Sequence, residues 1–160
     1  LGYDPDDAEL NQIFNTFKEL ADVKREITDA DLISLMSSHR RHVDVRESYK
    51  LNHVQVTCGD QQIPTATVTI TFPNEDLVTD ASTGTGPVDA VYKAINRIIK
   101  IPNSLTEFRV DSVTEGIDAI GDVTIRIKNE NGTFVGRGSD TDIIVASAKA
   151  YMNALNRACL

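Results

Sequence analysis

TATVTITF, residues Thr65–Phe72, is the stretch that decides the fold of this chain of 160 residues. Its apolar residues, Val68 and Ile70 among them, alternate with threonines, and this period of two is typical of a strand with one buried face. The pattern returns as VTIRI at Val123–Ile127. A strand that recurs after about 55 to 60 residues predicts an internal duplication.

The first copy extends to a β-β-β-α unit. Further strands are expected from about residue 51 to 58 and from 77 to 81, and a helix is expected to begin at Pro87, where a first-turn proline is tolerated, and to stop at Pro102. In the first of these strands, alternation predicts one face with Val54, Val56 and Cys58, and the opposite face with Leu51, His53 and Gln55.

The second copy repeats this order. Its strands are marked by Phe108, Val110 and Val113, by Val123–Ile127, and by the run that starts at Thr133–Gly136; a closing helix spans about Ile143–Ala158. AINRI in the first helix also answers ALNRA in the last. We therefore expect an α+β domain over residues 48–160, with pseudo-symmetric units at about 48–101 and 102–160 and helices on one side of the sheets.

The first 47 residues have a different period. Apolar residues recur at steps of three and four between Asp6 and Val23, and a second amphipathic segment begins at Thr28. Helices this short need something to pack on. We expect residues 1–47 to form a helical linker subdomain, and the missing initiator Met suggests that the chain is a fragment of a longer protein.

Composition limits the function classes. Apolar residues make up 41% of the chain, which supports a real core, and no apolar run reaches the roughly 18 residues of a membrane span. The net charge of −8 repels phosphate backbones, so neither nucleic acid nor a membrane is expected as a partner. With only Cys58 and Cys159, reduced thiols in a cytoplasmic protein are favoured over one disulfide.

Candidate chemistry in the chain is weak. His39 and His42 could share a face, but no third metal ligand is near them, and Cys58 lacks a cation that would lower its pKa. The glycine-rich loop at Gly84–Pro87 departs from dinucleotide and phosphate-binding patterns, which leaves a tight turn before a helix or a small-molecule site there. We predict no catalytic residues and no metal site.

Two loops in the second unit are better candidates. TEGIDAIGD (Thr114–Asp122) places apolar residues where a loop is normally polar, which indicates a pocket rim or a subunit contact. GRGSDTD puts Asp140 and Asp142 at the start of the last helix. These carboxylates either cap the helix or meet the ammonium group of a ligand.

The string GRGSDTDIIVASAKAYMNALNR (Gly136–Arg157) resembles the C-terminal end of 2-isopropylmalate synthases. LNHVQVTCGDQQIPTATVTI (Leu51–Ile70) and GTGPVDAVYKAI (Gly84–Ile95) resemble earlier parts of the same region, and residues 1–47 resemble the linker to the catalytic barrel. The resemblance implies a domain without chemistry of its own, which needs no cofactor. The absent metal-dependent barrel of the parent acyltransferase condenses acetyl-CoA with 2-oxoisovalerate in leucine biosynthesis.

The family's regulatory region pairs with a second copy and binds L-leucine near that interface, which produces feedback inhibition. By match to the family's motif, the effector-binding residues expected here are Gly116, Ile117, Asp118, Ala119, Ile120, Val123, Asp142 and Ile143. Glu115 departs from the smaller residue of many members and leaves the pocket shape open. Two alternatives stay open: an isoleucine sensor of the citramalate synthase type, or a dimerisation module that binds no effector.

Overall fold

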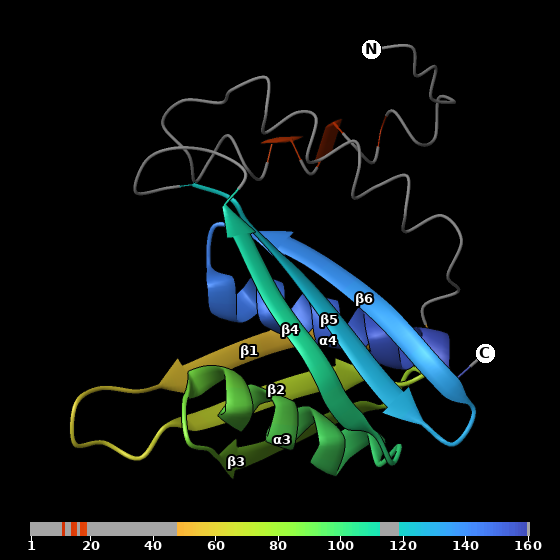
Figure 1. Ribbon diagram of the computed structural model, residues 1–160, viewed down its shortest axis with the longest axis horizontal. Coiled ribbons are helices and arrows are strands. Elements are labelled where there is room, and N and C mark those ends of the chain that lie inside the picture. The colour runs from red at the N-terminus through yellow and green to blue at the C-terminus, as the bar shows by residue number, and fades with distance from the viewer. Residues whose placement is uncertain (1–10, 12–13, 16, 19–47, 113–118, 160) are drawn as a thin grey trace.

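The computed structural model describes residues 48–112 and 119–159, and five residues of the N-terminal part, 11, 14, 15, 17 and 18. The elements follow the order β1 (Lys50–Thr57), β2 (Thr65–Thr71), β3 (Leu77–Thr83), α3 (Pro87–Ile99), β4 (Ser104–Ser112), β5 (Gly121–Asn129), β6 (Gly132–Asp140) and α4 (Ile143–Ala158). Figure 1 shows the two β-β-β-α units, and the duplication expected from the sequence is confirmed.

Each unit contains a three-stranded antiparallel sheet whose second strand lies in the centre. In β2 the side chains of Ala66, Val68 and Ile70 are fully buried, while the threonines between them face outward. The hydroxyls of Thr69 and Thr79 form a 2.9 Å hydrogen bond across β2 and β3. β5 buries Val123, Ile125 and Ile127 in the same alternating way. The alternation of apolar residues therefore identified the central strand of both sheets.

The predicted faces of β1 were wrong at its first residues. The register with β2 shifts between Leu51 and His53, so Asn52 is an extra residue in the strand. This bulge turns Leu51 to the face of Val54 and Val56, where all three pack against the core. β4 carries a matching shift between Leu105 and Glu107. Cys58 lies beyond the end of β1 and is exposed.

The helices pack on the inner faces of the sheets. α3 lies across β2 and β3, α4 lies across β5 and β6, and α4 also reaches β1. α4 approaches β6 so closely that a Cβ on Gly136 would lie 2.0 Å from the Ala150 carbonyl oxygen, and one on Gly138 would lie 2.4 Å from that of Ala146. Glycines in the strand and alanines in the helix therefore let the two backbones touch.

A tyrosine pair joins the two units at the contact between α3 and α4. The rings of Tyr92 and Tyr151 stack with their centroids 4.4 Å apart. The Tyr151 hydroxyl lies 2.8 Å from the side-chain oxygens of Asn96 and Asn103. The core is thus continuous from one unit to the other.

The N-terminal helices predicted from the sequence lie almost wholly outside the described residues. The five residues described there are helical, and the ring of Phe14 stacks on Phe17 with Lys18 above it. Within the part of the chain that the structure describes, no helix has the length and apolar character needed to cross a membrane.

Candidate functional site

The start of α4 is held by two aspartates. Asp142 is the N-cap, and its carboxylate accepts a 2.7 Å hydrogen bond from the Ile144 amide. Asp140 accepts the Asp142 amide at 3.0 Å and pairs with Lys149 at 2.7 Å. Negative charge at this end of a helix is stabilised by the unpaired amides and the helix dipole. Asp142 therefore caps the helix, which is one of the two roles that the sequence left open for these carboxylates.

The strand that enters this region meets α4 at Gly121. A Cβ on Gly121 would lie 3.1 Å from Cγ1 of Ile143, so the isoleucine side chain covers this glycine. Next to it, Ile120 is only 3% exposed, whereas Ile143 is 45% exposed. The structure therefore brings together the end of the candidate loop and the start of α4, each of which contributes an apolar side chain, one buried and one exposed.

Of the remaining predicted residues, Ala119 and Val123 are described and three others are not. Ala119 is half-buried, and Val123 is fully buried in the core beneath the site. Gly116, Ile117 and Asp118 lie outside the described residues. The full outline of a pocket at this loop stays a prediction.

A pair that sequence reasoning missed lies beside these residues. Asp122 and Ser139 face each other in the β5–β6 ladder, and the serine hydroxyl donates a short hydrogen bond to the Asp122 carboxylate. Together with Asp140 and Asp142, this places three carboxylates around the α4 start. Such a set favours a cationic group over an anionic one. The turn after Asn129 fixes the register of β5 and β6, and this register places Asp122 opposite Ser139. The turn was therefore the sequence signal for this pair.

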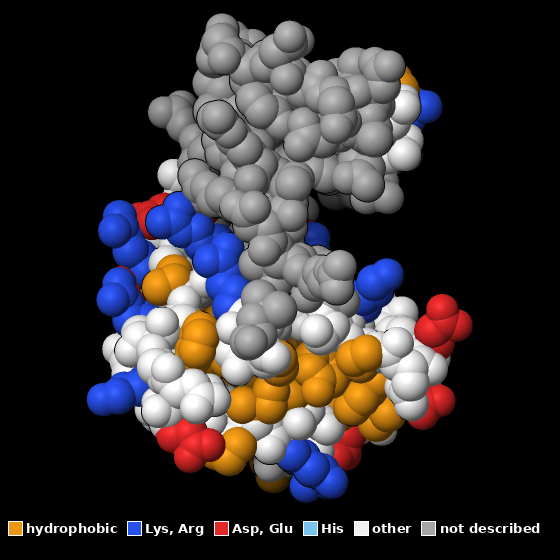
Figure 2. All heavy atoms as spheres, turned by 90° about the vertical axis from the view of Figure 1, so that its right-hand side faces the viewer, with side chains coloured by type: hydrophobic (Ala, Val, Ile, Leu, Met, Phe, Trp, Pro, Cys, Tyr) orange, Lys and Arg blue, Asp and Glu red, His pale blue; other side chains and the backbone are white. Residues whose placement is uncertain are grey.

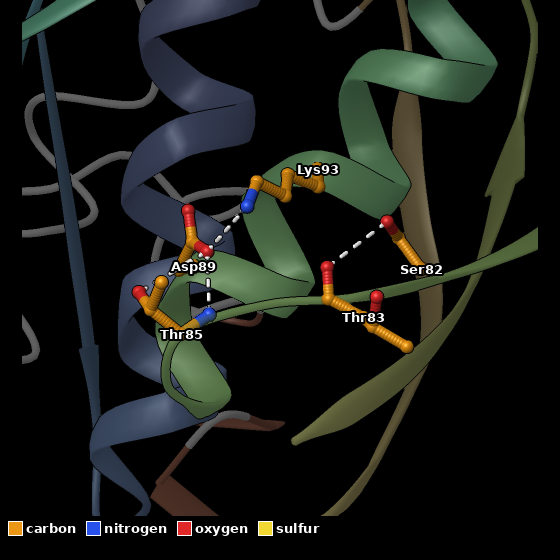
Figure 3. A network of polar contacts seen from close by, with 5 residues as sticks. All are labelled: Ser82, Thr83, Thr85, Asp89 and Lys93. Carbon is orange, nitrogen blue, oxygen red and sulfur yellow. Dashed lines mark hydrogen bonds and ion pairs between the residues drawn. The ribbon is translucent and has the colours of Figure 1, made fainter. Parts of the chain in front are cut away.

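The equivalent helix start in the first unit is occupied by its own side chains (Figure 3). The Asp89 carboxylate accepts the Thr85 amide at 2.8 Å and pairs with Lys93 at 2.8 Å, and these contacts hold the pKa of Asp89 below its usual value. A Cβ on Gly84 would lie 2.4 Å from the Ala90 nitrogen. The glycine-rich loop is thus packed onto its own helix, as the tight-turn interpretation requires.

Strand β4, which leads into the candidate loop, is open to solvent along all nine of its residues. Leu105, Phe108 and Val110 are each at least 40% exposed, and neither helix packs on the strand as an element. The Tyr92 ring of α3 makes an edge-to-face contact with Phe108, with the ring centroids 6.4 Å apart. An apolar edge strand of this kind is typical of a contact with another chain.

Apolar surface also occurs elsewhere. Figure 2 views the side of the molecule on which the C-terminus lies in Figure 1, and it shows a band of apolar side chains with basic side chains gathered at one edge. Exposed apolar surface is therefore a property of more than one face of the domain.

The residues considered for redox or metal chemistry are dispersed. Cys58 and Cys159 are free and exposed as residues, and partial burial of the Cys159 sulfur raises the pKa of its thiol. His53 is exposed on β1, and His39 and His42 lie outside the described part of the chain. Among the residues that the structure describes, no group of three or more His, Cys, Asp or Glu side chains could hold a metal ion.

These features define an α+β domain of two β-β-β-α units, with an acid-capped helix start beside a loop and an apolar edge strand. The family model of the LeuA allosteric (dimerisation) domain matches residues 26–159. The chain belongs to this family, and it is a regulatory, dimerisation region of the 2-isopropylmalate synthase type.

Individual relatives agree with this assignment. The chain is 55% identical, over 157 residues and 98% of its length, to 2-isopropylmalate synthases of Thermosynechococcus vestitus, Gloeobacter violaceus and Trichodesmium erythraeum. It spans 29% of the length of each of these relatives.

Proposed function

We propose that this domain binds L-leucine at the start of α4 and thereby mediates feedback inhibition of a 2-isopropylmalate synthase. The observation that carries the proposal is the contact of Gly121, the residue after Ile120, with Ile143, beside the carboxylates of the helix start. The family to which the chain belongs is described as allosteric, which supports a ligand site of this kind.

The residues suit a free branched-chain amino acid. The ligand's ammonium group needs acceptors, which Asp118 and the carboxylates near α4 provide. Its carboxylate needs donors, which amides of the loop at Gly116–Ala119 provide. Its apolar side chain needs a slot, for which the apolar character of Ile117, Ile120, Val123 and Ile143 is suited.

The working form in this proposal is a homodimer, with strand β4 at the contact between copies. Its row of exposed apolar side chains would be covered by the partner copy, and β4 runs directly into the candidate loop. Binding at a dimer contact lets a ligand favour one arrangement of the copies over another, which is the requirement for allosteric control.

The rest of the protein is proposed from the relatives. Residues 1–47 would form the helical linker between the domain at 48–160 and a catalytic barrel. That barrel would transfer the acetyl group of acetyl-CoA to 2-oxoisovalerate with a divalent metal, in the cytoplasm, and the present domain would contribute regulation without catalysis.

Titration calorimetry of the chain tests the site. Gly116→Asp places a charged side chain in the loop and should abolish leucine binding, whereas Gly59→Asp should not, because a Cβ at Gly59 has no neighbour closer than 3.9 Å. Equal leucine binding by both variants would place the site elsewhere. Two further outcomes identify the alternatives: isoleucine selectivity points to a citramalate synthase sensor, and no binding by a folded dimer points to a dimerisation module.

A further inference from the structure

Tyr49, the second residue of the described domain, is held by the far end of α4. The side-chain oxygen of Asn156 accepts the Tyr49 amide at 2.9 Å, and its side-chain nitrogen donates to the Tyr49 carbonyl oxygen at 2.9 Å. Asn156 is only 3% exposed. One carboxamide therefore fixes both backbone groups of one residue, as a neighbouring strand would, and we name this contact the Asn156 clamp.

Tyr49 lies just ahead of β1, whose ladder with β2 begins at Lys50. Its ring makes an edge-to-face contact with Phe72 at 5.1 Å, and burial raises the pKa of its phenol. Within the described residues, the hydrogen bond of the Tyr49 amide goes to Asn156. The clamp therefore sets where the chain leaves residues 1–47 and enters the domain.

The other end of α4 lies at the proposed leucine site, where Asp142 caps the helix and Ile143 covers Gly121. The helix has 16 residues, or about 24 Å at 1.5 Å per residue. The same rigid element thus touches the proposed site at its first turn and Tyr49 near its last.

The contact of α4 with β6 is built from small residues, whereas Tyr151 anchors the middle of the helix to α3. Ala146, Ala150 and Ala154 lie along the backbone of β6 at Gly136 and Gly138. Few large side chains interlock along this seam, so a shift of about 1–2 Å, the size seen for helices in allosteric transitions, costs less than it would in an interdigitated contact. A ligand at the first turn would select one position of the helix.

We propose that α4 and the Asn156 clamp transmit leucine occupancy to the chain that enters the domain at Tyr49. This inference rests on the proposed leucine site. Leucine bound against the first turn stabilises the position of α4 in which both hydrogen bonds of the clamp are formed. It thereby restrains the connection to residues 1–47. Because coupling is reciprocal, a closed clamp also favours leucine binding.

Amide hydrogen exchange of the 160-residue chain, resolved by NMR with and without saturating leucine, tests the inference. We expect leucine to slow exchange of the Tyr49 amide by about 5- to 150-fold, the usual range of allosteric coupling. Asn156→Ala should remove this response while leucine still binds in calorimetry. Asn153→Ala is the matched control, because Asn153 is a buried asparagine of the same helix that is not part of the clamp.

Each result of these experiments either supports or overturns the inference. If leucine binds and the Tyr49 exchange rate does not change in the unsubstituted chain, the inference is overturned and the leucine site stands. If leucine does not bind at all, the proposed function falls and the inference falls with it. If Asn156→Ala does not fold, the Tyr49 exchange rate of the unsubstituted chain still decides between these outcomes. In the complete synthase, full inhibition of the Asn156→Ala variant by leucine would also contradict the inference.

Discussion

The Tyr92 and Tyr151 rings stack at 4.4 Å between α3 and α4, yet their hydroxyl groups are in opposite situations. The Tyr151 hydroxyl lies within hydrogen-bonding distance of Asn96 and Asn103. The buried Tyr92 hydroxyl has no partner with hydrogen-bond geometry among the described residues; the nearby Ser147 hydroxyl donates instead to the Ile143 carbonyl at 2.7 Å. The same substitution should therefore have different effects at the two positions.

Tyr151→Phe should lower the free energy of unfolding by about 0.5–1.5 kcal/mol, because it removes the hydrogen bonding of the hydroxyl to the part-buried side-chain oxygens of Asn96 and Asn103. Tyr92→Phe keeps the ring stack and removes a hydroxyl that gains nothing from burial, so it should be neutral or slightly stabilising. Urea unfolding followed by circular dichroism measures both. Equal destabilisation by the two substitutions would show that the Tyr92 hydroxyl is bonded after all.

Alkaline pH should destabilise the domain through the same pair. Burial raises the pKa of both phenols, and the shift is larger for Tyr92. In the unfolded chain tyrosine ionises near pH 10, so the stabilisation is complete below about pH 10 and is lost as the pH rises further, by about 1.4 kcal/mol per pH unit for each tyrosine. Urea midpoints between about pH 8 and 11.5, on either side of that ionisation, test this. The variant with both Tyr92→Phe and Tyr151→Phe should lose stability less steeply above about pH 10. An equally steep loss would contradict the raised pKa of these two phenols.

The close contact of α4 with β6 predicts unequal effects for one type of substitution. Gly138→Ala places a Cβ 2.4 Å from the Ala146 carbonyl oxygen, which forces the helix away and should cost about 3 kcal/mol or more. Gly86→Ala has no atom within 4 Å of the new Cβ and an extended backbone, so the change should stay within about 1 kcal/mol. Thermal unfolding compares the two variants, and similar melting temperatures would argue against the close contact of α4 with β6.

The proposed dimer contact can be separated from general surface apolarity. Phe108→Asp puts a charge on β4 and should convert the dimer to monomer in sedimentation velocity. Leu77→Asp makes a comparable change on β3, at a side chain that is 66% exposed, and should leave the dimer intact. A dimer that survives Phe108→Asp but not Leu77→Asp would move the contact to the first sheet.

Much of the fold follows from local patterns in the sequence. The strands around Val68 and Val123 have strict alternation, and α4 was predicted with the bounds that the structure gives it, because Asp142 supplies a cap at its start. The face of Leu51 could not be predicted, since alternation assumes a regular strand and the bulge at Asn52 breaks that assumption.

The site was harder to predict than the fold. The helix-start pattern pointed to Asp142 and the family resemblance pointed to Ile143, but the hydrogen bond between Asp122 and Ser139 depends on cross-strand register. The Asn156 clamp joins residues 107 positions apart, a separation at which no local pattern operates. A buried asparagine near the end of an apolar helix was the only hint, and its partner was the backbone of Tyr49.

The most direct test of the central claim is calorimetric titration of the folded, dimeric chain with leucine, isoleucine and valine. We expect saturable binding that is selective for leucine, because the slot proposed beside Ile120 and Ile143 would distinguish branched side chains by shape, and a misplaced methyl group costs about 1–3 kcal/mol. The absence of heat with all three amino acids, from a dimer that is folded, would contradict the assignment of this domain as a leucine sensor.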